Sequence, residues 1–400
     1  MTRYAPSRGP IYGAYFGDSI MDPFSDAPAN IGSGGWPNLL GAISRQKLVM
    51  AYNGGVPGQT SAQVLARVGP TLSALLTAKV PISRAFMGEW INDQAQGVPF
   101  TTTLANHLAF VHTCWNLGIE PVIVLATPTR TFDYRRQNAG AAGYFAALEV
   151  TTVDVLPDLA DDRGLLRVEF DRGDGTHQND AGRMVTARKV LQVLGPFGPA
   201  HPYLASTDTD AANLVANGLF TGASTGGLPN DWADAGFGGA TATYSVSPAP
   251  PQGQTGRPAR GNRFRITKTN GAPGSTTTKD IFKQIVTGAN VVVGHRYAFA
   301  CEFAGATQGA FNPDGTLGTR SSYRLVLTWK NGSNAAIGSS LQPLCNWTPN
   351  VTDGVAYYET VAPAGAASLQ CELVVDGQNP AWFEVGAMTV LDLTALGRAP

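Results

Sequence analysis

The spacing of apolar residues changes about halfway along the chain. In residues 1–195, short apolar runs alternate with stretches whose apolar residues recur every three or four positions. The runs predict strands at Ile11–Gly17, Lys47–Tyr52, Arg84–Gly88, Pro121–Ala126 and Leu165–Phe170, and the periodic stretches predict helices at Gly35–Gln46, Ser61–Ala78, Thr103–Leu117, Ala141–Val155 and Ala181–Leu194. A strand followed by a helix, five times over, predicts a parallel sheet with helices on both faces.

The second half has a different pattern. A stretch rich in Gly and Pro occupies residues 195–203, and helical periodicity nearly disappears after it. We expect two domains, residues 1–197 and 211–400, joined by a linker at 198–210. Short strands with regular turn signals predict a β-sandwich in the second domain. The predicted strands are Arg263–Thr267, Asn290–Val293, Tyr297–Phe303, Tyr323–Trp329, Ala356–Val361, Ser368–Val375 and Trp382–Leu391.

Composition is that of a globular protein with no basic surface. Hydrophobic residues make up 43% of the 400 residues and charged residues 14%, which is enough apolar material for two cores. The net charge of −1 argues against nucleic acid as a partner. No run of about 18 apolar residues exists, so we expect no membrane insertion. Residues 1–10 lack the apolar core of a signal peptide, so we expect a cytoplasmic protein, or one that is extracellular or virion-associated by another route.

The four cysteines do not suggest a metal site. None forms a Cys-x-x-Cys pair, so we expect neither a metal nor another cofactor. Cys114 lies in a helical pattern and is expected to be a buried thiol. One disulfide could form among Cys301, Cys345 and Cys371, but their spacing does not decide the pairing.

Gly17-Asp18-Ser19 directly follows the first predicted strand. In open α/β sheets, catalytic groups gather at the carboxyl ends of the strands. A serine in a turn there presents its hydroxyl outward, and its backbone N–H can point at a developing oxyanion. The alternative is an ordinary turn, for which this composition is common.

Two further motifs follow the next two predicted strands. The glycine-rich segment 53–60 would let a backbone N–H approach a substrate closely, although it could simply be a turn before a helix capped by Thr60 or Ser61. Asn92-Asp93 comes after the third strand. The Asn92 amide can donate to an oxyanion, or the pair can form a helix cap.

Asp174-Gly-Thr-His177 precedes the last predicted helix. A serine hydroxyl needs a base to become a good nucleophile, and histidine titrates near neutral pH. An aspartate three residues earlier can accept the proton of the other ring nitrogen and so orient the imidazole. The alternative is a helix N-terminus capped by Asp174 or Asp180. His107 and His112 lie in a helical pattern, where we expect them to face solvent or pack.

These four motifs, in this order, resemble those of the SGNH (GDSL-like) hydrolase superfamily over roughly residues 10–195. The resemblance implies a flavodoxin-like three-layer α/β/α domain and a serine-esterase mechanism. It implies Ser19 as nucleophile, His177 as base and Asp174 as the partner of His177. The N–H groups of Ser19 and Gly58 and the Asn92 side chain would form the oxyanion hole.

The chain departs from the family pattern in the third motif. The family has a glycine where this chain has Trp90, which is expected to line the pocket and contact substrate. The nearby Gly54 and Gly55 leave open which glycine is the second donor, and Gly58 is preferred because it precedes Gln-Thr-Ser. Arg130, in the loop after the fourth predicted strand, is a candidate for substrate binding or a solvated loop residue.

The second domain begins like a jelly-roll carbohydrate-binding module. Asn217-Gly-Leu-Phe220 is followed by a Gly/Pro segment that ends at Trp232, as in those modules. Trp232, Trp329, Trp347 and Trp382 could stack on sugars or fill the core.

The sequence therefore favours a serine esterase that removes O-acetyl groups from a polysaccharide. A general short-chain esterase, lipase or thioesterase is the second hypothesis. A glycan-binding virion or adhesion protein without catalysis is the third. The oligomeric state is not decided by the sequence.

Overall fold

The computed structural model divides the chain into two compact units, residues 1–201 and 202–399. Most of the predicted linker lies outside the described residues, so the domain limits stay a prediction. The structure describes residues 10–22, 35–88, 90–195, 204, 210–235, 242–248, 261–268, 279–287, 290–307, 321–338, 340–346, 352–377 and 381–397.

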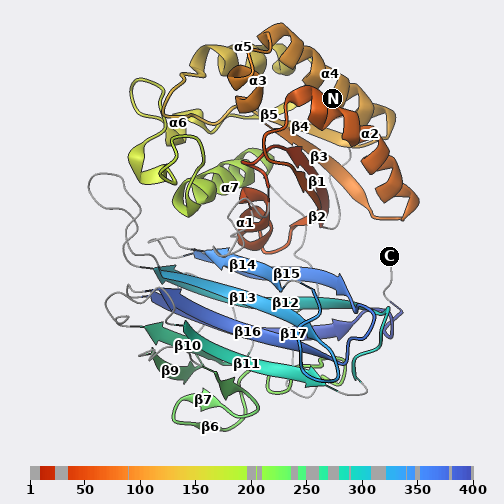
Figure 1. The fold of residues 1–400 in the computed structure, drawn as a ribbon, viewed down its shortest axis with the longest axis vertical. Coiled ribbons are helices and arrows are strands. Elements are labelled where there is room, and N and C mark those ends of the chain that lie inside the picture. The colour runs from red at the N-terminus through yellow and green to blue at the C-terminus, as the bar shows by residue number, and fades with distance from the viewer. Residues whose placement is uncertain are drawn as a thin grey trace. The chain divides into compact units, whose positions relative to one another are not determined.

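The first unit is built on a five-stranded parallel sheet (Figure 1). The strand order β2-β1-β3-β4-β5 is that of flavodoxin-like doubly wound sheets. In such sheets the carboxyl ends of the strands meet at one edge, where the first three sequence motifs also lie. The strands are β1 (Ile11–Gly17), β2 (Leu48–Gly55), β3 (Ile82–Gly88), β4 (Glu120–Val124) and β5 (Thr151–Val153).

Helices cover both faces of this sheet. α1 packs against α7, and α2 packs against α4 on the opposite face (Figure 1). The central strands are buried on both sides, as shown by the fully buried Phe16 and Phe86. The predicted three-layer α/β arrangement is therefore confirmed. The helices are α1 (Trp36–Ile43), α2 (Ser61–Thr77), α3 (Ile91–Ala95), α4 (Phe100–Asn116), α5 (Arg135–Ala146), α6 (Leu156–Leu159), the 3₁₀ helix η1 (Val168–Phe170) and α7 (Asp180–Leu194).

The fifth strand is not where the apolar pattern predicted it. The helix expected over Ala141–Val155 ends at Ala146, because Glu149 adopts φ +58° and the Val150 N–H bonds to the Phe145 carbonyl. The chain then forms β5, which is too short to show a periodic pattern. The expected strand at Leu165–Phe170 is instead a loop ending in η1, and the Leu166 N–H bonds to Thr129 outside the sheet.

The second unit contains two five-stranded antiparallel sheets, with orders β15-β12-β17-β10-β9 and β14-β13-β16-β11-β8. The jelly-roll connection pattern stays a prediction. Six of the seven predicted strands are present, but Asn290–Val293 is a turn region whose Val292 and Val293 are 42% and 50% exposed. The strands are β6 (Ser224–Thr225), β7 (Leu228–Pro229), β8 (Ala233–Asp234), β9 (Ala242–Ser247), β10 (Arg263–Lys268), β11 (Lys279–Thr287), β12 (Arg296–Thr307), β13 (Ser321–Lys330), β14 (Leu341–Asn346), β15 (Thr352–Val361), β16 (Ser368–Gly377) and β17 (Ala381–Asp392).

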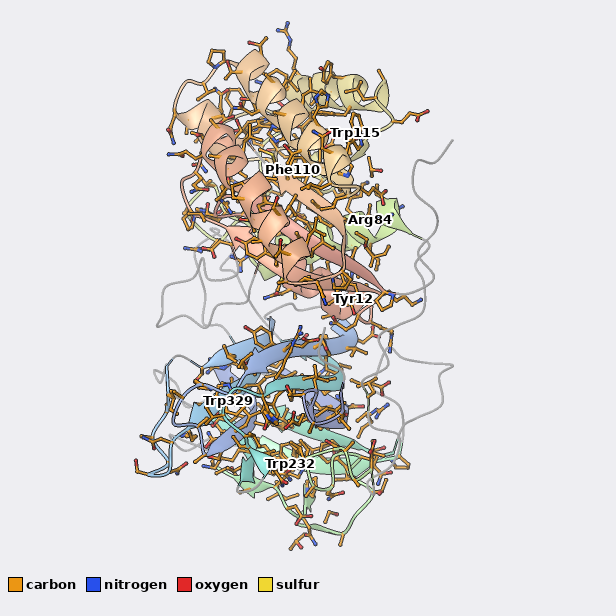
Figure 2. The ribbon with its side chains drawn as sticks, turned by 90° about the vertical axis from the view of Figure 1, so that its right-hand side faces the viewer. Tyr12, Arg84, Phe110, Trp115, Trp232 and Trp329 are labelled. Atoms are coloured by element: carbon orange, nitrogen blue, oxygen red, sulfur yellow. The ribbon has the colours of Figure 1, made fainter. Side chains whose placement is uncertain are left out.

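Two of the four tryptophans proposed for sugar stacking belong to the core of this unit. Trp232 and Trp329, labelled in Figure 2, are buried. Trp232 stacks on Phe282 with ring centroids 5.0 Å apart. Trp347 lies outside the described residues. Trp382 is partly exposed, and the Arg265 guanidinium lies 4.3 Å from its ring centroid.

The disulfide that the cysteine spacing left open is absent. Cys301 and Cys371 are buried free thiols, as is Cys114 in the first unit. Any bond among Cys301, Cys345 and Cys371 would require at least one of these two thiols, so none forms. Across the described residues, no helix has both the length and the apolar character that a membrane span requires.

Candidate active site

Ser19 lies in a tight turn at the carboxyl end of β1. The Asp18 carbonyl accepts hydrogen bonds from the N–H groups of Met21 (3.3 Å) and Asp22 (3.1 Å), which closes the turn. The Asp18 carboxylate accepts the Ile20 N–H at 2.9 Å and is buried beneath the turn. Ser19 itself is partly exposed, so its hydroxyl can meet a ligand.

The loop that carries Asp174 and His177 follows η1, and not a strand as the sequence predicted. Its conformation depends on Asp171, whose Oδ1 accepts the N–H groups of Gly173 (2.8 Å) and Gly175 (3.1 Å). The Arg130 N–H donates to the Gly175 carbonyl at 2.7 Å. Asp171 is not among the residues predicted from the sequence, although an aspartate followed by glycines at the second and fourth positions is a turn signal.

The cap of α7 is neither Asp174 nor Asp180. Asn179 is the N-cap, and its side chain accepts the Gly182 N–H at 3.1 Å. The helix-cap alternative for Asp174 is therefore wrong, and its carboxylate is available for another role.

Ser19, His177 and Asp174 form a continuous hydrogen-bonded chain. His177 Nε2 lies 2.7 Å from Ser19 Oγ, across 158 positions of sequence. His177 Nδ1 lies 2.8 Å from Asp174 Oδ2. Asp174 Oδ1 accepts the backbone N–H groups of His177 (2.8 Å) and Thr176 (2.9 Å).

The surroundings of Asp174 favour its ionised form. Partial burial opposes ionisation, but the hydrogen bonds from the His177 ring, the His177 N–H and the Thr176 N–H outweigh it and hold the pKa of Asp174 well below its usual range. Arg172 adds a cation, with its Nε 3.6 Å from Asp174 Oδ2. An ionised Asp174 keeps the proton of His177 on Nδ1, which leaves Nε2 free to accept the Ser19 proton.

The glycines of segment 53–60 differ in their surroundings: two lie in a strand and one lies in an exposed loop. Gly54 and Gly55 belong to β2, and the Gly55 N–H donates to Asn53 Oδ1 at 2.9 Å. A Cβ on Gly55 would lie 2.4 Å from the Asp22 nitrogen, so this position requires glycine. Gly58 is exposed with φ +77° and open space around it. These features favour Gly58 as the donor over the two earlier glycines.

Gly58 is held by its neighbours. Its carbonyl accepts Gln96 Nε2 at 3.3 Å. Within the described part of the chain, neither the Gly58 N–H nor the Ser19 N–H has an acceptor. Thr60 is the N-cap of α2, and its N–H donates to Gln63 Oε1 at 2.9 Å. Both N–H groups, of Gly58 and of Ser19, are thus available to a ligand.

Asn92 lies at the start of α3 and reaches back to the serine turn. Its Nδ2 donates to Asp18 Oδ2 at 3.0 Å and to the Gln59 carbonyl at 3.2 Å. The following residue, Asp93, is buried and anchors this segment, since it accepts the Ser61 hydroxyl (2.5 Å) and the Thr103 hydroxyl (2.6 Å). The structure therefore brings Asn92 to the serine turn, with both of its amide hydrogens engaged.

The two residues predicted to contact substrate, Trp90 and Arg130, differ in exposure. Trp90 is only 3% exposed and packs edge-on against Phe100 and His107, so it fills the interior and does not line an open pocket. His107 is fully buried, with Nδ1 2.9 Å from the Thr103 carbonyl. The Arg130 side chain is exposed and donates to the Leu166 carbonyl at 3.3 Å. Its substrate contact stays a prediction.

Asp18 should make the protein less stable at high pH than at low pH. Burial raises its pKa from 3.8 to about 6, against the opposing effects of the Ile20 N–H, His177 and Asn92. A raised pKa means that the folded protein binds this proton more tightly than the unfolded chain. The stabilising contribution is therefore complete below about pH 4 and is lost as the pH rises through about 6.

Asp18→Asn removes this titration. Relative to the wild type, its free energy of unfolding should rise by up to about 2–3 kcal/mol between pH 4 and pH 8, as expected for a pKa shift of about two units. Urea unfolding at several pH values measures this difference. Asp161→Asn is the control, because the pKa of the exposed Asp161 is lowered from 3.8, so it titrates below this range and its difference should stay nearly constant between pH 4 and pH 8. A flat difference for Asp18→Asn would contradict the assignment.

No metal site accompanies these residues in the part of the chain that the structure describes. There, no group of three or more His, Cys, Asp or Glu side chains is arranged to hold a metal ion.

Comparison with known proteins gives only structural likenesses. No family model and no curated protein matches the sequence. A GDSL-like lipase from Bacteroides thetaiotaomicron is 18% identical, with a TM-score of 0.36, and the match covers 45% of this chain and 86% of the lipase. A carbohydrate esterase of family 3 from Talaromyces cellulolyticus is 12% identical, with a TM-score of 0.34, covering 45% and 94%.

A third similar structure extends over more of this chain. The enzymatically active domain of tailspike protein 4 from bacteriophage CBA120 is 10% identical, with a TM-score of 0.32, and the match covers 68% of this chain and 30% of the tailspike.

Proposed function

We propose that this chain is a serine esterase that works through an acyl-enzyme. The observation that carries the proposal is the hydrogen-bonded chain from Ser19 Oγ through the His177 ring to Asp174. A hydroxyl, an imidazole and an ionised carboxylate in this order are the groups that nucleophilic acyl transfer requires.

The proposed reaction has two matching halves. Ser19 Oγ attacks the ester carbonyl carbon while His177 Nε2 takes the hydroxyl proton. His177 then gives this proton to the leaving alcohol as the C–O bond breaks, and the acyl group stays on Ser19. Water then attacks the acyl carbonyl carbon as its proton passes to His177, and His177 returns that proton to Ser19 Oγ as the bond to Ser19 breaks and the acid leaves. Asp174 stabilises the imidazolium in both halves.

Three donors are proposed for the oxyanion. The N–H groups of Ser19 and Gly58 have no acceptor among the described residues, so they can bind the oxyanion without breaking a bond. Asn92 is the third, and its amide would exchange its bond to Asp18 or Gln59 for one to the oxyanion.

The proposed substrate is an O-acetylated polysaccharide. This part of the proposal rests on the resemblance of the second half to carbohydrate-binding modules. Among the described tryptophans named above, Trp382 is the one that is partly exposed, and since Arg265 lies over one face of its ring, a sugar would stack on the other face.

An activity panel tests the substrate. Acetate release from acetylated xylan and acetylated pectin is measured beside hydrolysis of p-nitrophenyl acetate and p-nitrophenyl palmitate, with Ser19→Ala as the blank. We expect acetate release from at least one glycan and no hydrolysis of the palmitate. Turnover of p-nitrophenyl acetate alone would make the chain a general short-chain esterase. Glycan binding with no ester hydrolysis would favour a binding protein.

A further inference from the structure

Arg67 on α2 connects the two loops that carry the proposed backbone donors. Its Nη2 donates to the Gly17 carbonyl at 3.0 Å, two residues before Ser19. Its Nε donates to Gln59 Oε1 at 2.8 Å, one residue after Gly58. A single guanidinium thus spans the serine turn and the glycine loop.

The setting of Arg67 restricts its movement. The guanidinium lies 5.9 Å from the centroid of the Phe16 ring. A Cβ on Gly54 would lie 2.6 Å from Arg67 Nη1, so the glycine leaves the room that the side chain occupies. Burial lowers the pKa of Arg67 and a hydrogen bond with Tyr52 opposes this, but a guanidinium remains charged at any working pH.

The third proposed donor belongs to the same network. The Gln59 carbonyl accepts the Asn92 amide, and that amide also donates to Asp18. These hydrogen bonds lead from Arg67 to Gln59, from Gln59 to Asn92 and from Asn92 to Asp18. Asp18 directly follows Gly17 in the chain, and the Gly17 carbonyl accepts Arg67, which closes the circuit. Each of the three proposed donors is in this circuit or one residue away from it.

Gly58 needs such support more than the other donors. No atom outside its immediate neighbours lies within 4 Å of where its Cβ would be, and it adopts a left-handed conformation in an exposed loop. Donors stabilise an oxyanion well only when they are already oriented before charge develops. The loop is tied to β1 by the Val56 N–H, which donates to the Gly17 carbonyl at 3.0 Å, and the Gln59 N–H closes it on the Val56 carbonyl at 3.3 Å. The side chains of Gln59 and Gln96 add the contacts next to Gly58 itself.

We infer that Arg67 is a positioning residue that sets the spacing between the Ser19 and Gly58 N–H groups in the oxyanion hole. The inference rests on the proposed serine-esterase function. Arg67 touches no reacting atom and is hydrogen-bonded to neither Ser19 nor His177. Its loss should therefore weaken transition-state binding, while substrate binding and the pH at which activity falls stay the same.

Arg67→Met tests this, because methionine retains much of the apolar stem and removes the guanidinium. With p-nitrophenyl acetate, kcat should fall about tenfold to a hundredfold, the usual effect of a small misplacement of catalytic groups, with KM changed by less than about threefold. Arg84→Met is the matched control. Arg84 is another half-buried arginine, bonded to Glu120 at 2.5 Å and labelled in Figure 2, and it lies in the first half of β3, away from the carboxyl edge. The Arg84→Met variant should have a lower melting temperature and an unchanged kcat.

A transition-state mimic separates positioning from folding. Ser19 Oγ adds to the carbonyl carbon of 1,1,1-trifluoroacetone, its proton passes to His177, and the resulting hemiketal oxyanion occupies the hole. The inhibition constant should rise in Arg67→Met by the same factor as kcat falls. Arg67→Lys can reach the Gly17 carbonyl or Gln59 but not both, so its loss should be intermediate.

Three outcomes would overturn the inference: kcat in Arg67→Met within twofold of the wild type, a fall in kcat with unchanged inhibition by the ketone, or a pH profile displaced along the pH axis. Failure of the proposed function is recognised separately, because the wild type would then neither hydrolyse ester nor be inhibited by the ketone.

Discussion

Ser19→Ala should reduce kcat for ester hydrolysis by about 10⁴-fold or more, which is the loss expected when the nucleophile of a hydrogen-bonded triad is removed. The fold should be unaffected, because the hydroxyl bonds only to His177 among the described residues. Steady-state hydrolysis of p-nitrophenyl acetate gives the rate, and thermal unfolding checks the fold. A covalent adduct with a phosphonate ester, detected by intact mass, should form with the wild type and not with the variant.

Ser73→Ala is the matched control for this experiment. Ser73 is an exposed serine on α2, and its replacement should leave kcat unchanged. If Ser19→Ala kept more than about a hundredth of the wild-type kcat, the nucleophile would have to be another group. The proposed mechanism would then be wrong even if the protein hydrolyses esters.

Asp174→Asn should reduce kcat by about 10⁴-fold, through the tautomer of His177 and not through the fold. The oxygen of the introduced amide can still accept the N–H groups of Thr176 and His177, which bond to Oδ1 in the wild type. The amide nitrogen then takes the place of Oδ2 and points its hydrogens at His177 Nδ1. The imidazole must carry its proton on Nε2 and can no longer accept the proton of Ser19.

Kinetics with p-nitrophenyl acetate and nitrogen NMR of labelled histidine test both parts of this prediction. Asp161→Asn is a close match, because Asp161 Oδ1 also accepts two backbone N–H groups, of Arg163 (2.9 Å) and Leu165 (3.0 Å), and Oδ2 also accepts a side chain. It should retain full activity. Activity of Asp174→Asn within tenfold of the wild type would show that Asp174 does not control the tautomer.

The parallel sheet and the three residues of the proposed triad were predictable from local sequence. A strand formed by an apolar run such as Pro121–Ala126 has apolar side chains on both of its faces. Both faces must be buried, and helices on both sides of a parallel sheet bury them. Ser19 stands out because it directly follows the first apolar run. The Asp174–His177 motif stands out because its spacing along the chain is part of the chemistry. The three-residue separation of Asp174 and His177 allows one tight turn to join carboxylate and ring.

The fifth strand and the support of the site were decided by the tertiary structure alone. β5 is three residues long, and pairing with β4 rather than its own periodicity makes it a strand. Arg67 bonds to a backbone carbonyl 50 residues away, and Asn92 bonds to Asp18 across 74 residues. Every residue has a backbone carbonyl, so residue type does not reveal which one a guanidinium will reach. Sequence can therefore identify the groups proposed to react, whereas only the folded chain brings together the groups that hold them.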